Sequence, residues 1–142
     1  MSNFYNDILT DHNLHPVHKH ELAVCSCTKD GVNPSCGDEI TLNLQIEDGV
    51  IADGSFTGSG CAVSQASADI MLDLVIGRSI DDAQRLHELF TKMIRGEADT
   101  AELDKLEEAA ALSDISHMPA RVKCAMLGWR TMNEMIEQQE HR

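Results

Sequence analysis

The residues of this chain best suited to chemistry are three cysteines, each close to glycine or proline. Their settings are NPSCGD around Cys36, GSGC ending at Cys61 and PARVKC ending at Cys124. Asp38 lies two residues after Cys36. Three thiolates and one carboxylate are enough to complete a tetrahedral Zn²⁺ site. Because thiolates also suit iron–sulfur units, the residue types leave zinc and iron–sulfur chemistry both open.

Each of these cysteines is predicted at the junction between a turn and a regular element. Cys61 and Cys124 fall in the first turns of predicted helices, where free N–H groups and the helix dipole favour a thiolate. Cys36 and Asp38 are expected in the extended start of a strand, which directs both side chains to one side. Cys124 lies away from the apolar stripe that begins at Val122, so it is not expected in the core. Three ordinary buried cysteines are the alternative interpretation, because free cysteine is often buried.

The spacing of apolar residues predicts which strands and helices position these residues, and it changes from strand-like to helical along the chain. Alternation of apolar and polar residues predicts a strand over 40–47, and Asp48-Gly49 predicts a tight turn into a return strand over 50–57. A further strand is predicted over 22–28. Helices are predicted over the first dozen residues with Ser2 as cap, over 61–77, after Ser79, over 97–114 and from Pro119 onward. Strands followed by helices predict an α+β domain.

Length and charge restrict the classes of function. A chain of 142 residues amounts to one domain and can bury a core without disulfides. A formal net charge of −13 gives a surface that repels nucleic acid and anionic lipid, so neither is expected as a partner. The N-terminal residues lack the pattern of a signal peptide, which predicts the cytoplasm. Thiols stay reduced there, so the five cysteines are expected as ligands or nucleophiles rather than disulfides.

The three cysteine motifs, with ILTDH (8–12) and Pro16, resemble the motifs of the NifU-like (IscU/SufU) iron–sulfur cluster assembly proteins. The motifs occur in the family's order, and the resemblance covers essentially the whole chain. It implies a single domain over 1–142, built from a small antiparallel sheet with helices packed on one face.

Within that family, the chain looks closest to the SufU branch. The acidic stretch over 97–114 resembles the helical insertion of that branch, and Arg121 resembles a residue of its third motif. Lys123 stands where members that build clusters usually have histidine. Arg121 and Lys123 both add positive charge near the sulfur of Cys124.

The resemblance to SufU proteins also implies a ligand set and a role. It implies a zinc ion bound by Cys36, Asp38, Cys61 and Cys124, and persulfide sulfur accepted from a cysteine desulfurase of SufS type. Cys36 is the expected acceptor, which would make the protein a persulfide relay of the sulfurtransferase kind. The alternative is a scaffold that assembles iron into a [2Fe-2S] cluster on the same ligands and transfers it to apo-proteins downstream.

Two other groups of residues could bind metal. A histidine-rich segment contains His12, His15, His18 and His20, and a pair is formed by Cys25 and Cys27. Histidines in loops are usually solvated, so a ligand role is the less favoured interpretation, and His12 is expected in a structural or partner contact. The cysteine pair is expected to be two small buried or edge residues rather than a second redox or metal site.

Overall fold

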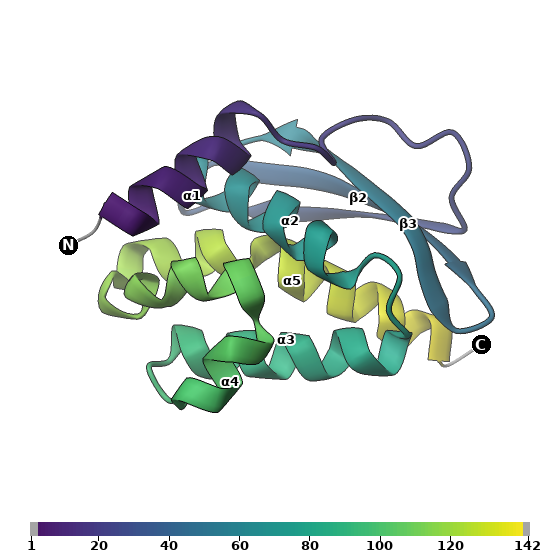
Figure 1. Ribbon diagram of the computed structural model, residues 1–142. Coiled ribbons are helices and arrows are strands. Elements are labelled where there is room, and N and C mark those ends of the chain that lie inside the picture. The colour runs from purple at the N-terminus through teal and green to yellow at the C-terminus, as the bar shows by residue number, and fades with distance from the viewer. Residues whose placement is uncertain (1–2, 141–142) are drawn as a thin grey trace.

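The protein is described from a computed structural model, which covers residues 3–140 (Figure 1). Its elements in chain order are α1 Asn3–Leu14, β1 Cys27–Asn33, β2 Asp38–Glu47, β3 Val50–Ser59, α2 Ala62–Val75, α3 Ile80–Ile94, α4 Thr100–Lys105, the 3₁₀ helix η1 Glu107–His117 and α5 Pro119–Glu140. Strands followed by helices confirm the predicted α+β class. The proposed cap Ser2 lies outside the described residues.

The three strands form an antiparallel sheet in the order β1-β2-β3. In β2 the alternate residues Ile40, Leu42 and Leu44 are buried, as their period predicts. Asp48 and Gly49 connect β2 to β3 with φ angles of 53° and 76°. Two positive φ angles in succession match the type I′ turn that joins twisted strands, so the predicted hairpin is confirmed.

The strand predicted over 22–28 is wrong in position, because β1 begins only at Cys27. Its core-facing positions include Gly31, which has no side chain to contribute to an apolar pattern. A Cβ at Gly31 would lie 2.2 Å from Oγ1 of Thr131 in α5, so glycine lets the helix approach the sheet closely. The position of this strand depends on the close packing of Gly31 against α5, and the periodicity of the sequence does not reveal that packing.

Helices lie on one side of the sheet in two layers (Figure 1). α2 contacts β3, and α5 contacts β1 and β2, while α3 packs on α5 away from the sheet. Phe90 of α3 stacks on Trp129 of α5 with ring centroids 4.3 Å apart and an interplanar angle of 10°. This stacked pair of buried rings joins the outer layer to the inner one.

α5 is buried over more of its circumference than its apolar stripe predicts. Cys124 is 0% exposed and belongs to the hydrophobic core, so the expectation that it lies away from the core is wrong. Val122 and Met126, which the predicted stripe includes, are only half-buried. The reason is that α5 packs between the sheet and α3 and so buries two faces.

The acidic stretch predicted as a helix over 97–114 is helical only from Thr100, and it forms two helices, α4 and the 3₁₀ helix η1, which ends at His117. Asp99 caps α4 with a capping box that includes Glu102, since each side chain bonds the backbone N–H of the other residue. In η1, Leu112 and Ile115 are fully buried in the common core. The stretch therefore has an acidic outer face and an apolar inner face that packs on α2, α3 and α5.

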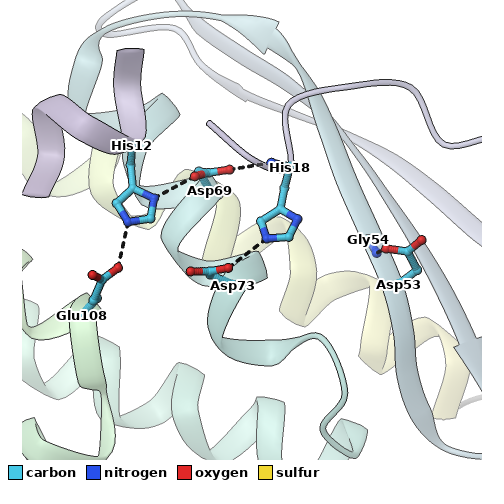
Figure 2. Close-up of polar contacts among 7 residues, drawn as sticks. All are labelled: His12, His18, Asp53, Gly54, Asp69, Asp73 and Glu108. Carbon is cyan, nitrogen blue, oxygen red and sulfur yellow. Dashed lines mark hydrogen bonds and ion pairs between the residues drawn. The ribbon is translucent and has the colours of Figure 1, made fainter. Parts of the chain in front are cut away.

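The histidine-rich segment, which begins at His12 in the last turn of α1, is partly fixed in place rather than fully solvated. The His18 carbonyl accepts a hydrogen bond from the Phe56 amide of β3 at 2.9 Å. His12 is 8% exposed and its Nδ1 lies 2.7 Å from Oδ2 of Asp69 in α2 (Figure 2). His15 and His20 are exposed. Within residues 3–140, no helix is long and apolar enough to cross a membrane.

Replacing Leu112 by alanine tests whether η1 shares the common core. We expect a loss of about 2–5 kcal/mol in the free energy of unfolding, because a fully buried leucine leaves a cavity. The matched control is Leu14→Ala, where the side chain is 64% exposed and the expected change is within about 0.5 kcal/mol. Urea denaturation followed by circular dichroism measures both. Equally small losses would show that η1 packs independently of the core.

Candidate metal centre

One end of the sheet brings three of the four predicted ligands together. Cys36 lies in the turn between β1 and β2, Asp38 is the first residue of β2, and Cys124 lies in the second turn of α5. One donor atom from each of these residues lies within 4.8 Å of the other two. The Sγ atoms of Cys36 and Cys124 are 3.2 Å apart. Residues 88 positions apart in sequence therefore meet at a single point.

The turn that holds Cys36 differs from the extended conformation predicted for it. Residues 34–37 form the turn of the β1–β2 hairpin, and the Cys36 amide donates to the Asn33 carbonyl at 3.3 Å. Gly37 has a φ of 70°, which a residue with a side chain rarely adopts. The turn leaves Cys36 exposed, whereas Asp38 and Cys124 are fully buried. Cys36 is thus the thiol of this group that an incoming protein can reach.

Asp38 is a buried carboxylate held by several hydrogen bonds. Its Oδ1 accepts from the Cys61 amide at 2.8 Å, and its Oδ2 accepts from Nδ2 of Asn33 at 3.1 Å. Burial by itself raises the pKa of the Asp38 carboxyl. Hydrogen bonds from Cys61, Cys124, Asn33 and Ser64 lower it by a larger amount, so the net pKa is below its ordinary value. Asp38 is therefore an anion at neutral pH and is available as an oxygen ligand.

Cys61 lies beside this group but its sulfur is not part of it. The residue precedes α2 and is half-buried, and its amide bonds to Asp38. Among the described residues, the donor atoms that are mutually within 4.8 Å do not include the Cys61 thiol. Gly60 lets the backbone before Cys61 lie close to the Asp38 carboxylate, since a Cβ there would be 2.4 Å from Oδ1 of Asp38. The backbone of Cys61 is thus fixed against Asp38.

Burial and the neighbouring Arg121 set the electrostatic environment of the sulfurs. Burial raises the pKa of the Cys124 thiol, and hydrogen bonds to Cys36, Asp38 and Cys61 raise it further. The exposed Arg121 guanidinium has a raised pKa because it hydrogen-bonds Cys124 and because the thiolate forms of Cys61 and Cys124 attract its charge. Arg121 therefore lies next to two of the three sulfurs and provides the positive charge there.

Asn33 is a residue of this centre to which the sequence assigned no role. It is 3% exposed, and its Nδ2 donates to Asp38 and lies 3.6 Å from Sγ of Cys124. Its place at the start of the NPSCGD motif was the available signal. A buried amide that contacts both a carboxylate and a thiol fixes their relative positions.

The remaining candidates lie elsewhere. Lys123 is exposed and lines a groove of about 320 Å³ between α3 and α5 together with His87 and Arg130. Cys25 is exposed and its Sγ lies 3.5 Å from Oγ1 of Thr28. Cys27 is half-buried at the start of β1, where its Sγ lies 3.9 Å from the Leu44 carbonyl oxygen.

The donor set suits a small thiophilic cation. Donor atoms around a tetrahedral Zn²⁺ lie about 3.3–3.8 Å apart when the metal–ligand bonds are about 2.0–2.3 Å long. The 3.2 Å separation of the Cys36 and Cys124 sulfurs is close to this spacing. Two thiols and a carboxylate that is already ionised therefore fit zinc, and they fit iron as well.

Comparison with known proteins identifies the family. Residues 4–125 match the family model described as NifU-like N terminal domain. The chain is 41% identical over 133 residues to the "Iron-sulfur cluster assembly scaffold protein IscU" of Thermotoga maritima, covering 94% of this chain and 92% of that protein. It is 32% identical over 140 residues to the "Zinc-dependent sulfurtransferase SufU" of Bacillus subtilis, covering 99% and 94%.

Solved structures agree with this assignment. A putative iron–sulfur cluster assembly scaffold protein for the SUF system from Fervidobacterium islandicum superposes with a TM-score of 0.81 at 30% identity, covering 94% of this chain and 93% of that one. A NifU-like N-terminal structure from Brucella abortus, at 21% identity and a TM-score of 0.79, shares the fold and covers 99% of both chains. The chain belongs to the NifU-like N-terminal domain family, which includes proteins named IscU and SufU.

Alkylation rates in the reduced, metal-free protein test the environments of the thiols. At about pH 8 we expect iodoacetamide to modify Cys124 at least about tenfold more slowly than Cys36, because Cys124 is buried and has a raised pKa. Exposed Cys25 serves as the internal reference. Peptide mass spectrometry gives the rate at each site, and protein unfolded in urea should lose the difference. Equal rates for Cys36 and Cys124 in the folded protein would contradict this arrangement.

Proposed function

We propose that this protein is a zinc-dependent sulfur acceptor in iron–sulfur cluster assembly, which receives persulfide sulfur from a cysteine desulfurase. The observation that carries the proposal is the meeting of exposed Cys36 with buried Asp38 and Cys124 at one end of the sheet. An acceptor thiol has to be reachable by a partner, while the groups that hold it can remain buried. The similarity to the Bacillus subtilis zinc-dependent sulfurtransferase supports the same role.

In this proposal the zinc ligands are Cys36, Asp38, Cys61 and Cys124. Three of them already have donor atoms close together. Cys61 has its amide bonded to Asp38 and its thiol next to Cys124, so an adjustment of its side chain would complete the set. When bound, zinc supplies stabilisation of thiolates, which keeps the cysteines deprotonated and protected from oxidation.

The proposed transfer moves one sulfur atom between cysteines. The Cys36 thiolate attacks the outer sulfur of a persulfide on the desulfurase and forms a new S–S bond to it. The S–S bond of the donor breaks, and its electron pair leaves on the donor cysteine as a thiolate. One S–S bond forms as another breaks, so the step needs no oxidant or reductant. Arg121, beside Cys61 and Cys124, stabilises the negative charge of the sulfurs during the exchange.

The partner we propose is a cysteine desulfurase of SufS type, which would carry the persulfide in the cytoplasm, where thiols stay reduced. The net charge of −13 favours a partner with a basic docking surface. The recipient of the sulfur would be the next protein of cluster assembly.

The second candidate function is a scaffold that assembles a [2Fe-2S] cluster on the same residues. It is favoured by the 41% identity to a Thermotoga maritima protein named as a scaffold. The chemistry of the donor set is compatible with both roles. The metal content of the isolated protein separates them, because zinc protein is colourless, whereas a cluster brings iron, acid-labile sulfide and visible absorbance.

Sulfur transfer is tested by incubating the zinc-loaded protein with a SufS-type desulfurase and L-cysteine. We expect one added sulfur atom on Cys36, and a loss of at least about tenfold in this adduct in Cys36→Ser, because the acceptor sulfur is removed. The matched control is Cys25→Ser, which removes an exposed thiol outside the centre and should leave the adduct unchanged. Mass spectrometry of intact protein and of peptides under non-reducing conditions measures it.

The result that would remove the relay is equally clear. An adduct of unchanged size in Cys36→Ser, or no adduct on wild-type protein that holds zinc, would contradict it. Protein isolated with iron and sulfide and without zinc would favour the scaffold instead.

A further inference from the structure

A second group of side chains that could hold a metal ion lies where α1, α2 and η1 meet. His12, Asp73 and Glu108 each offer a donor atom, and the three atoms lie within 4.8 Å of one another. Nε2 of His12 is 2.8 Å from Oε1 of Glu108. Figure 2 shows the His12 ring between Asp69 on one side and Glu108 on the other, with Asp73 next to them.

Two side chains of this group, His12 and Asp73, are each oriented by another residue. Nδ1 of His12 donates to Oδ2 of Asp69 at 2.7 Å, and Asp69 is 1% exposed. The other oxygen of Asp69 accepts from the His18 amide at 2.8 Å, and Nε2 of His18 lies 3.1 Å from Oδ1 of Asp73. A carboxylate that holds one ring nitrogen of a histidine leaves the other nitrogen directed at a metal, which is the usual support for a histidine ligand.

The space around the group suits a hydrated cation. Two of its three members, Asp73 and Glu108, line a surface cavity of about 190 Å³ together with Ile70 and Leu106. Ligand atoms on a divalent ion with bonds of about 2.1 Å lie about 3.0–3.4 Å apart, so the 2.8 Å between His12 and Glu108 has to open by a few tenths of an ångström. The Glu108 side chain is 59% exposed and can move by that amount.

We propose that His12, Asp73 and Glu108 form a second metal site, which binds a divalent first-row transition ion with water in its remaining positions. One imidazole and two carboxylates favour ions such as Mn²⁺, Fe²⁺ or Zn²⁺ over ions that require thiolates. Asp69 and His18 are positioning residues, since they hold His12 and Asp73 rather than face the ion. The ion would connect α1 and α2 to η1, and this site is independent of the sulfur-transfer proposal.

Mn²⁺ is the probe that separates this site from the cysteines, because it prefers oxygen and nitrogen ligands to thiolates. The protein is first loaded with one equivalent of Zn²⁺ and then titrated with Mn²⁺, with free ion followed by electron paramagnetic resonance. We expect one Mn²⁺ per chain with a Kd below about 1 mM, and nitrogen coupling from one imidazole in the spin-echo modulation. The Cys36→Ser variant, titrated without added Zn²⁺, should bind Mn²⁺ as metal-free wild type does.

Variants with exposed side chains avoid the risk of unfolding. Asp73→Asn and Glu108→Gln should each weaken Mn²⁺ binding at least about tenfold, because each removes a charged ligand at a position that is more than half exposed. The matched control is Glu107→Gln, which removes an equal charge from the same cavity but pairs with Arg78, and it should change the Kd less than about twofold.

Three results would overturn the proposal. The absence of Mn²⁺ binding would show that His12 serves only as an ion-pair partner of Asp69 and Glu108. Equal weakening by Glu107→Gln would indicate general attraction to an acidic surface, and bound Mn²⁺ without nitrogen coupling would exclude His12 as a ligand.

Discussion

The buried carboxylate of Asp38 is the constraint on which the cysteine centre depends. A charged group that is fully buried has to be satisfied by hydrogen bonds or by a cation, because the loss of its hydration is costly. Asp38 obtains these contacts from the end of β1 through Asn33, from the start of α2 through the Cys61 amide, and from α5 through Cys124. Satisfying one carboxylate therefore brings together the segments that carry the three cysteines.

Features with a local signal could be predicted from the sequence. The β2–β3 hairpin follows from its alternation and from Asp48-Gly49, and the start of α3 follows from Ser79, which accepts from the Asp82 amide. The burial of Cys124 could not be predicted in this way, since it depends on α5 being enclosed between the sheet and α3. β1 begins later in the sequence than the pattern predicts, because Gly31 faces α5 without adding to any apolar pattern.

The sequence likewise predicts some features of the candidate site and not others. The motifs identified the cysteines and Asp38, but not that Asn33 would contact both Asp38 and Cys124, nor that Lys123 would face the groove between α3 and α5. The partnership of His12 with Asp69 joins residues 57 positions apart, and no spacing in the sequence predicts it. A charged residue in the apolar run of α2 was the available sign, because Asp69 is flanked by buried Ala68 and Ile70.

α2 connects both groups of polar residues, with Cys61 before its first turn and Asp69 and Asp73 further along it. The central claim is that four side chains of the cysteine centre bind one zinc ion, and X-ray absorption at the zinc edge tests it most directly. We predict three sulfur neighbours at about 2.3 Å and one oxygen neighbour at about 2.0–2.2 Å in zinc-loaded protein, with one sulfur fewer in Cys61→Ser. A first shell made only of nitrogen and oxygen, or a sulfur count unchanged by that substitution, would contradict the account.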